Sequence, residues 1–185
     1  MDQDLNIARG KESLADGLDE ASLQLIRERL GREPRGLRAV AVADGAREPM
    51  VLRVASVVDG KPFPTLYWLI DPTLSLKIDR EEAGGTIARL QEQIDGDPAL
   101  QAAMDADHRR HIALRETFLQ GSERRVLEDS GAWPALAQRG IGGIANFSRI
   151  RCLHTWYGAH LVIPNTVGQL LDSHWAAAPR EPGPE

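Results

Sequence analysis

The hydrophobic pattern of the chain changes at Pro72, and this change limits the folds that the chain can adopt. Before it lie three runs rich in Val, Leu and aromatic residues, LRAVAVA (37–43), PMVLRVASVV (49–58) and PTLYWLI (64–70), separated by the turn-forming segments DGARE and DGKPFP. After Pro72 the apolar residues recur with the period of a helix. The sequence therefore predicts an α+β fold, in which an antiparallel three-stranded meander is followed by and packed against several α-helices.

The third run is apolar on both sides of the expected strand. One face carries Leu66, Trp68 and Ile70, and the other face carries Thr65, Tyr67 and Leu69. A strand with two apolar faces is typically buried on both. We therefore expect this strand to be central in the sheet or covered on both sides.

Helical periods predict several helices around these strands. The best-defined helix begins at Asp97, a suitable N-cap, with Pro98 in its first position, and another runs from the N-cap Asp19 to a C-terminal stop at Gly31. Less regular apolar stripes predict helices over three further segments, 83–94, 123–138 and 146–161. Glycines at 84 and 85 weaken the first of these helices, and Gly131 and Pro134 disturb the second.

Length and composition favour a single domain. A chain of 185 residues is about 1.2 times a usual domain of ~150 residues and is long enough to bury a core without disulfides or a structural metal. The two ends lack a sustained period, and the tail AAAPREPGPE is rich in Pro and Glu. We expect a mobile N-terminal segment over 1–17, one α+β domain over 18–175 and a disordered tail over 176–185.

The charge balance disfavours two classes of partner. With 22 Lys and Arg against 27 Asp and Glu, the net charge of −5 repels nucleic acid and anionic membranes. No apolar run approaches the ~20 residues of a membrane helix. The N-terminus lacks a signal-peptide pattern, and the single cysteine, Cys152, cannot form an internal disulfide. We expect a cytoplasmic protein that binds no nucleic acid and no membrane.

The segment RGIGGIANFSRIRCLH is the strongest candidate for a ligand site. Gly140, Gly142 and Gly143 can leave backbone amides uncovered, and Asn146 or Ser148 could cap a following helix whose first amides also point outward. Such a loop can hold an oxyanion. The alternative is a tight connection between helices in which the glycines serve packing, and a short glycine motif by itself favours this alternative.

Arginines flank this loop. Arg149 and Arg151, with Arg139, offer guanidinium groups whose geometry suits phosphate or carboxylate. The expected ligand-binding residues are Gly140, Gly142, Gly143, Arg149, Arg151 and His154.

Cys152, His154 and His160 form a second candidate, because cysteine and histidine can bind zinc or act as nucleophile and base. On one continuous helix, Cys152 and His154 lie about 200° apart and His154 and His160 about 120° apart, so the three cannot converge on one ion. We therefore expect no metal and interpret His154 first as a core histidine. Cys152 and His154 are also candidate catalytic residues.

A third candidate lies in the helix that begins at Asp97. Asp107 and His111 are four residues apart on its apolar face, where an unpaired polar group would be costly, so we expect them to pair with each other. An Asp that orients a His also occurs in catalytic sites, but no nucleophile lies nearby in the sequence.

The segment KPFPT approaches the third strand between two prolines, Pro62 and Pro64, which stiffen it. Either it presents Lys61 and Thr65 at the rim of a pocket, or it is a rigid connection with Phe63 in the core.

Three blocks of the sequence, LGREPRG, DGKPFPTLYWLIDP and GIGGIANFSRIRCLHTWYGAH, resemble an uncharacterised bacterial family, domain of unknown function five-hundred-and-one. The resemblance runs from about Leu30 to Gly168 and implies no reaction. In some actinobacteria, members of the family are encoded beside a septum-formation protein and a polyphosphate or nucleotide phosphatase, so the resemblance implies an association with cell division or phosphate metabolism. It also marks His108 as a family histidine and a further catalytic candidate.

The chain departs from this family at two points. Many relatives carry cysteines near the first hairpin and after the third strand, which together with the CLH block suggest a thiolate metal site. Here Asp71 stands where one of these cysteines is expected, and Cys152 is the only cysteine in the chain. His160 lies one place beyond the expected histidine, where Ala159 stands instead. Both departures argue against an inherited metal site.

The sequence favours a small-ligand pocket that accepts an anionic group, without a cofactor. The alternative is a non-catalytic module that binds a protein partner and whose polar pairs specify the fold. No triad motif, Walker sequence, HExxH or CxxC pair is present, so the sequence does not decide whether the protein is an enzyme. A pocket containing His154 and Arg149 or Arg151 would favour the first function, and a large exposed apolar patch the second.

Overall fold

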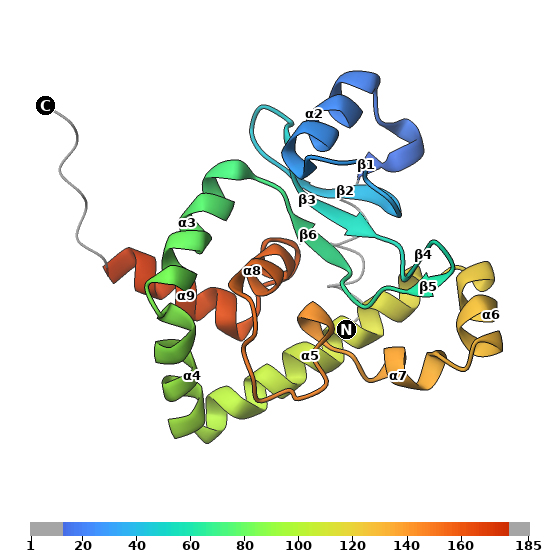
Figure 1. The fold of residues 1–185 in the computed structure, drawn as a ribbon. Helices are drawn as coiled ribbons and strands as arrows, with labels where there is room; N and C mark the ends of the chain where they lie inside the picture. The colour runs from blue at the N-terminus through green and yellow to red at the C-terminus, as the bar shows by residue number, and fades with distance from the viewer. Residues whose placement is uncertain (1–12, 178–185) are drawn as a thin grey trace, which may run out of the picture.

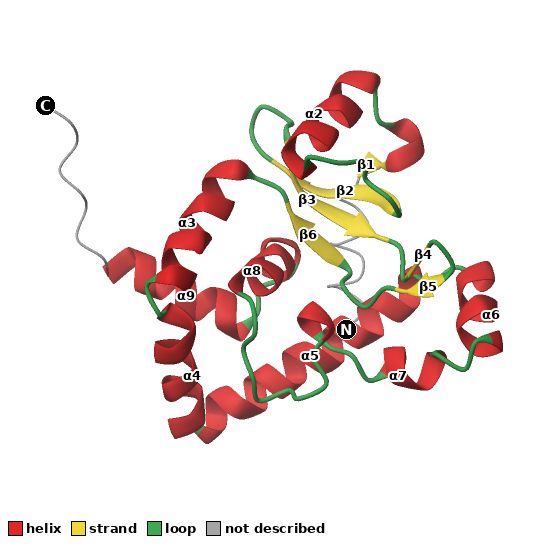
Figure 2. Cartoon of the chain, in the orientation of Figure 1, coloured by secondary structure: helices red, strands yellow, loops and turns green. Residues whose placement is uncertain are grey.

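A computed structural model describes residues 13–177 of the chain. Its main sheet is antiparallel and has the strand order β1 (Ser13–Leu14), β2 (Leu37–Ala43), β3 (Pro49–Val54) and β6 (Tyr67–Leu69) (Figure 2). Strands β2, β3 and β6 are adjacent in the sheet in their chain order, with the short strands β4 and β5 of a separate sheet between β3 and β6 in the sequence; this confirms the α+β class with a three-stranded meander. Strand β1 adds an edge to it.

The first strand and the 3₁₀ helix η1 (Ala15–Gly17) fall inside the segment 1–17 that the sequence analysis expects to be mobile. Residues 13–17 belong to the fold, because Ser13 and Leu14 pair with Val40 and Ala39 of β2. The remainder of that segment and nearly all of the expected tail lie outside the described residues.

The run 49–58, expected as one strand, is divided after Val54. Its last two residues form β4 (Val57–Val58), which pairs with β5 (Lys61–Pro62) in a separate hairpin. Asp59 and Gly60 form the turn with φ of 50° and 72°, the left-handed conformation that a two-residue hairpin loop requires. The division occurs because the Asp-Gly turn closes a local hairpin instead of joining two long strands.

Strand β6 stands at the edge of the sheet, and both of its faces are covered. Tyr67 and Leu69 pack in the core formed with the C-terminal helices, whereas Trp68 and Ile70 pack in the core beneath α2 (Glu20–Leu30). The strand is therefore not central, and the second of the two expected arrangements is the one observed.

Among the helices within residues 13–177, α2 is the helix that covers one face of the sheet (Figure 1). Asp19 caps it as predicted, accepting a hydrogen bond of 2.8 Å from the backbone of Ser22, and Gly31 ends it with a φ of 65°. Ile26 is completely buried against Leu52 and Val54 of β3 in this smaller core.

The other face carries the larger core, to which α5 (Pro98–Phe118), α8 (Leu153–Val162) and α9 (Thr166–Ala177) contribute. Trp156 and Leu153 of α8 are fully buried there with Met104 of α5. Helix α5 begins at the predicted N-cap, because Asp97 accepts from the backbone of Ala99 at 2.8 Å. None of the helices within residues 13–177 is both long and apolar enough to cross a membrane.

Three predicted helices have different bounds. The segment 83–94 corresponds to α4 (Thr86–Gly96), which is separated by Gly84 and Gly85 from an unexpected helix, α3 (Pro72–Ala83). The segment 123–138 is divided at Gly131, with a φ of 68°, into α6 (Gly121–Asp129) and α7 (Trp133–Ala137). The third helix begins only at Leu153, so residues 146–152 are not helical.

Candidate functional site

The three glycines of the predicted anion loop pack against side chains. The loop forms the 3₁₀ turn η2 (Ile141–Gly143), in which Gly142 and Gly143 have φ of 66° and 73°. A Cβ added at each glycine would meet another residue: His108 Nδ1 at 2.2 Å from Gly140, Thr155 Oγ1 at 2.6 Å from Gly142, and Pro64 Cγ at 2.8 Å from Gly143. The glycines therefore permit close approach of three other segments.

The backbone amides of this loop are also used within the protein. The amide of Gly140 donates to the carbonyl of Ile144 at 2.8 Å, and that of Gly143 donates to the carbonyl of Gly140 at 3.0 Å. The amide of Ile141 donates to His108 Nδ1 at 3.0 Å. These three amides point away from any external anion, as the packing alternative predicts.

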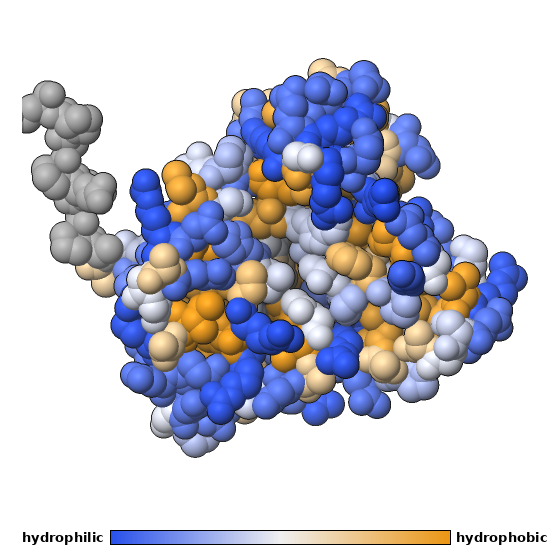
Figure 3. Space-filling view, viewed as in Figure 1, coloured by the Kyte–Doolittle hydropathy of each residue, from blue (hydrophilic) through white to orange (hydrophobic). Residues whose placement is uncertain are grey.

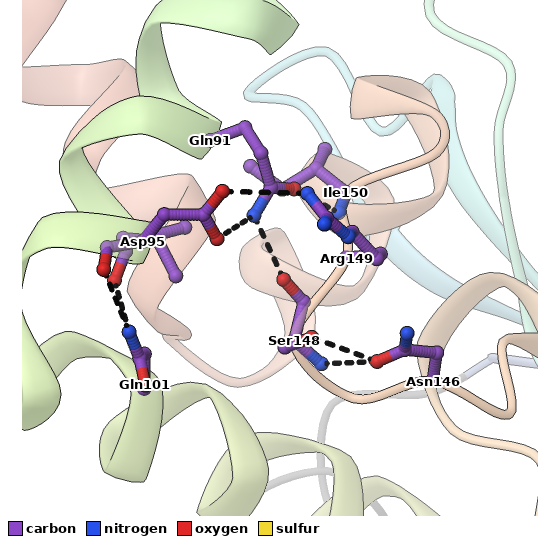
Figure 4. A network of polar contacts seen from close by, with 8 residues as sticks. Gln91, Asp95, Gln101, Asn146, Ser148, Arg149 and Ile150 are labelled. Atoms are coloured by element: carbon purple, nitrogen blue, oxygen red, sulfur yellow. Dashed lines mark hydrogen bonds and ion pairs between the residues drawn. The ribbon is translucent and has the colours of Figure 1, made fainter.

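Hydrogen bonds tie the next segment to α4 (Figure 4). Gln91 donates to the carbonyl of Ser148 at 2.8 Å and accepts from the amide of Ile150 at 2.9 Å. Arg149 Nη1 lies 3.3 Å from Asp95 Oδ2, so its charge is already partnered. Asn146 accepts from Ser148 and closes a local turn; it does not cap α8.

Arg151 is exposed and precedes α8, so the expected position of both arginines in the first turns of a helix is wrong. The loop and His154 also face different spaces. Ile141 lines a buried cavity, whereas His154 lines an open cleft together with Thr155. The predicted ligand residues thus do not converge on one pocket.

Cys152 and His154 lie side by side, contrary to the helical angle expected for them. Cys152 occupies the N-cap position of α8 with φ of −153°, and its extended backbone turns Sγ to within 3.8 Å of His154 Nδ1. Glu82, at the end of α3, joins them: its Oε1 lies 3.4 Å from His154 Nδ1 and accepts a 2.6 Å hydrogen bond from the amide of Leu153. Burial raises the pKa of the Cys152 thiol.

His154 stands in acidic surroundings. Its Nε2 lies 3.3 Å from the carbonyl oxygen of Ser75 and 3.4 Å from Asp79 Oδ1, and its side chain is 24% exposed. With Glu82 on the other ring nitrogen, two carboxylates flank this imidazole. His154 is thus only partly buried, whereas the sequence analysis interprets it first as a core histidine.

His160 does not join Cys152 and His154. Its Nε2 is 3.0 Å from Asp172 Oδ2, and its Nδ1 accepts from the amide of Asn165 at 3.1 Å. Tyr157 stacks on His160 and donates to Asp172 at 2.9 Å, and burial raises the pKa of that tyrosine. This group fixes α9 against α8.

His108 is a fully buried anchor for the glycine loop. It accepts from Ile141, stacks on Phe147 with ring centroids 4.5 Å apart, and meets Trp156 edge-on at 4.7 Å. Burial lowers the pKa of His108 to about 4, so it is neutral at pH 7. Its contacts account for a role in the fold.

The expected pair of Asp107 with His111 is wrong. Asp107 Oδ1 accepts from Arg110 at 2.8 Å, and Oδ2 accepts from the amide of Thr166 at 2.7 Å. His111 Nε2 has no hydrogen-bond partner among residues 13–177 and lies beside a cavity of about 20 Å³. Burial lowers the pKa of His111 to about 3.

The KPFPT segment follows the second of its two alternatives. Phe63 packs edge-on against Trp68, with ring centroids 5.6 Å apart, in the core beneath α2. Lys61 is exposed on β5, and neither Lys61 nor Thr65 lines the cleft of His154.

That cleft lies between the C-terminal end of α2, strand β6 and the start of α8, and has a volume of about 270 Å³. Figure 3 shows hydrophobic residues at the surface just below α2. Arg32 stands in the wall of the cleft, with its guanidinium carbon 4.8 Å from the centroid of the Trp68 ring. Its lining residues are Leu30, Arg32, Tyr67, Trp68, Leu69, His154 and Thr155.

Sequence reasoning missed Arg32, Asp79 and Glu82. Asp79 and Glu82 lie in the charged run DREE on α3. Ile78 is the only buried residue of this helix, so its sequence shows no clear apolar stripe from which a helix could be predicted. Arg32 follows the Gly31 stop directly, a position that the sequence marks only as the end of a helix.

The family described as "Protein of unknown function (DUF501)" matches residues 40–173, which extend from β2 into α9. The chain belongs to this family. No curated protein and no solved structure matches it. The matched region of the DUF501 protein contains Glu82, Cys152 and His154, whereas Arg32 and the LGREPRG block precede it. The family description names no reaction, so the function is argued from the geometry.

Proposed function

We propose that the protein binds a small ligand with an anionic group, phosphate or carboxylate, in the cleft between α2 and α8. The observation that carries the proposal is Arg32. Its guanidinium is exposed, lies over Trp68 at 4.8 Å, and has no carboxylate partner within the described part of the chain. Stacking on an aromatic face orients the guanidinium fork, which can then receive two oxygens of an anion.

The rest of the cleft suits a small ligand. Leu30, Trp68 and Leu69 supply apolar wall, and His154 and Thr155 supply polar groups. A mostly apolar cleft with a few polar groups is typical of small-molecule sites. His154 is the only residue of the expected ligand set that lines it.

The glycine loop supports this cleft indirectly. Thr155 lines the cleft and packs against Gly142, where a Cβ would come within 2.6 Å of its hydroxyl oxygen. The Thr155 hydroxyl donates to the carbonyl of Cys152 at 3.0 Å. The loop therefore helps to position one wall of the site, and the anion itself is assigned to Arg32.

The most exposed large hydrophobic side chains do not favour the alternative of a protein-interaction module. The large hydrophobic residues exposed within residues 13–177 are Leu14, Leu76 and Val126, which lie on β1, α3 and α6. These three residues lie on separate elements, so they do not together form the contiguous apolar patch that marks a docking surface.

The test is a thermal-shift and calorimetric screen of phosphate, pyrophosphate, nucleotides and small carboxylates at constant ionic strength. We expect Arg32→Ala to weaken the best ligand about 10-fold to 100-fold, because a charge-assisted contact contributes roughly 1.5–3 kcal/mol. The matched control is Arg35→Ala, which removes an arginine three residues away that pairs with Asp59 and does not line the cleft. An equal response of the two variants, or no stabilisation of the parent by any anion, would reject the proposal.

A further inference from the structure

Glu82, Cys152 and His154 bring three different metal-ligating atoms together at the border of the cleft. A carboxylate oxygen, the thiol sulfur and an imidazole nitrogen all lie within 4.8 Å of one another. These are the three ligand types that zinc uses in proteins. The cluster joins the end of α3 to the start of α8, and its residues are half-buried.

The hydrogen bonds around His154 select the ring nitrogen that could bind a metal. The carbonyl oxygen of Ser75, 3.3 Å from Nε2, can only accept, so Nε2 carries the proton. Nδ1 then directs its lone pair toward Cys152 Sγ and Glu82 Oε1. Metal-binding histidines commonly have this arrangement, in which one ring nitrogen donates to a carbonyl or carboxylate and the other binds the ion.

With a neutral imidazole and no cation, the centre of the cluster is electrostatically unfavourable. The Nδ1 lone pair and the Glu82 carboxylate are both acceptors, and their atoms lie only 3.4 Å apart. The Cys152 thiol has one proton and can satisfy one of them. A divalent cation between the three atoms would displace the thiol proton to solvent and interact favourably with the thiolate, the carboxylate and the Nδ1 lone pair.

The protein also holds the ligands in place. The amide of Leu153 donates to Glu82 Oε1 at 2.6 Å and fixes the orientation of that carboxylate. The Thr155 hydroxyl binds the carbonyl of Cys152 and fixes the turn into α8. Asp79, 3.4 Å from His154 Nε2, adds negative charge outside the cluster.

We propose that Glu82, Cys152 and His154 bind a divalent transition-metal ion, with Zn²⁺ as the first choice. A thiolate and an imidazole in the set favour zinc over Mg²⁺ or Ca²⁺, which prefer oxygen ligands. The protein supplies three ligands, which leaves a fourth position for water or for a ligand of the cleft that His154 also lines. This inference replaces the expectation of no metal, whose angular argument assumed that Cys152 is helical.

The proposal does not depend on Arg32 or on anion binding, and Asp71 has no part in it. The Asp71 carboxylate, at the position where relatives carry a cysteine, caps α3 by accepting from the amide of Leu74 at 2.7 Å. Failure of the anion screen and failure of metal binding are therefore separate results.

The experiment titrates chelator-treated, reduced full-length protein with Zn²⁺ in competition with a chromophoric chelator, and with Co²⁺ in an absorption measurement. We expect one Zn²⁺ per chain and a thiolate-to-cobalt charge-transfer band. Cys152→Ser should remove that band and weaken Zn²⁺ binding by more than about 100-fold, the upper range for loss of an outer-shell partner. Glu82→Gln should weaken binding but keep the band.

His174→Gln is the matched control. His174 Nε2 lies 3.1 Å from Glu81 Oε2, a histidine–carboxylate contact without a cysteine, and its loss should leave Zn²⁺ affinity unchanged. Circular dichroism checks that each variant is folded. If a variant unfolds, the parent protein still tests the proposal, because bound Zn²⁺ should slow the reaction of Cys152 with a thiol reagent. Absence of the charge-transfer band together with no protection, or equal affinity in Cys152→Ser and the parent, would overturn the proposal.

Discussion

Gly140 lies against His108 with no room for a side chain between them, since a Cβ at this position would lie 2.2 Å from Nδ1. Its φ of −82° is open to any residue, so the constraint is steric. We expect Gly140→Ala to lower the free energy of unfolding by about 1–3 kcal/mol, the usual cost of overpacking. Urea denaturation measures it, with Gly96→Ala as control because no atom lies within 4 Å of a Cβ there. Equal stability of the two variants would show that the loop can move away from His108.

The two buried histidines of α5 predict a pH dependence of stability. Burial lowers the pKa of His108 to about 4 and that of His111 to about 3, whereas in the unfolded chain both titrate near 6.5. The unfolded state therefore binds more protons below pH 6.5, and the stabilisation present above that pH is lost as the pH falls toward 4.

Each histidine contributes a slope of up to about 1.4 kcal/mol per pH unit in this range. Urea unfolding of the parent at pH 7, 6 and 5 should show the combined loss. His111→Gln, which cannot titrate, should be less sensitive to pH than the parent between pH 6 and 5. The same slope in both proteins would mean that His111 is protonated in the folded state.

For single residues, the sequence indicates which side chains could act in a site but not which residues they contact. It singles out Cys152 and His154, yet their proximity depends on α8 beginning at Leu153, seven residues later than the apolar stripe suggests. Glu82 is 70 residues away from Cys152 in the chain, and no local pattern connects them. The opposite error occurs at Asp107, whose sequence neighbour His111 is not its partner.

The beginnings and ends of some helices can be predicted from a few neighbouring residues. Asp-Pro predicts the start of α5 at 97–98, and the same pair at Asp71–Pro72 marks the start of α3, where it could have been used. Helix α3 escapes prediction because it buries few apolar residues of its own. Paired glycines at 84 and 85 end it, since Gly85 takes a φ of 80°.

Asp107 joins two helices that are far apart in the sequence. Its carboxylate accepts from the buried amide of Thr166, the first residue of α9, at 2.7 Å, and from Arg110 at 2.8 Å. We expect Asp107→Ala to lower the free energy of unfolding by about 1–3 kcal/mol, because that amide loses its acceptor inside the protein.

The control for this change is Asp105→Ala on the same helix. Asp105 pairs with Arg109 at the surface, where the two side chains are 43% and 71% exposed, and the loss of such a pair should cost less than about 1 kcal/mol. Chemical denaturation compares the two variants. Equal effects would mean that the α9 amide finds another acceptor once Asp107 is removed.

The whole molecule is organised around one sheet whose strands serve two cores. On β3, Val51 faces the larger core and Leu52 the smaller one. The alternation of the three runs predicts a sheet with helices on it, and this much follows from local patterns. Which helices cover which face depends on contacts between distant segments, so the sequence does not show that α2 lies on one face and the C-terminal helices lie on the other.

The shared strands predict that the two cores unfold together. Trp68 lies in the core beneath α2, and Trp156 is buried on the other side of the sheet. In variants that retain one or the other of these tryptophans as the single fluorophore, we expect each protein's fluorescence and far-ultraviolet circular dichroism to give the same urea midpoint. Ile26→Ala, which truncates a fully buried residue of α2, should cost about 2–5 kcal/mol and lower the midpoint equally for both probes. Leu76→Ala, at a side chain that is 53% exposed, is the control and should move neither midpoint much. A shift confined to Trp68 would show that α2 separates from the sheet before the rest of the molecule unfolds, and that the shared strands do not couple the two cores.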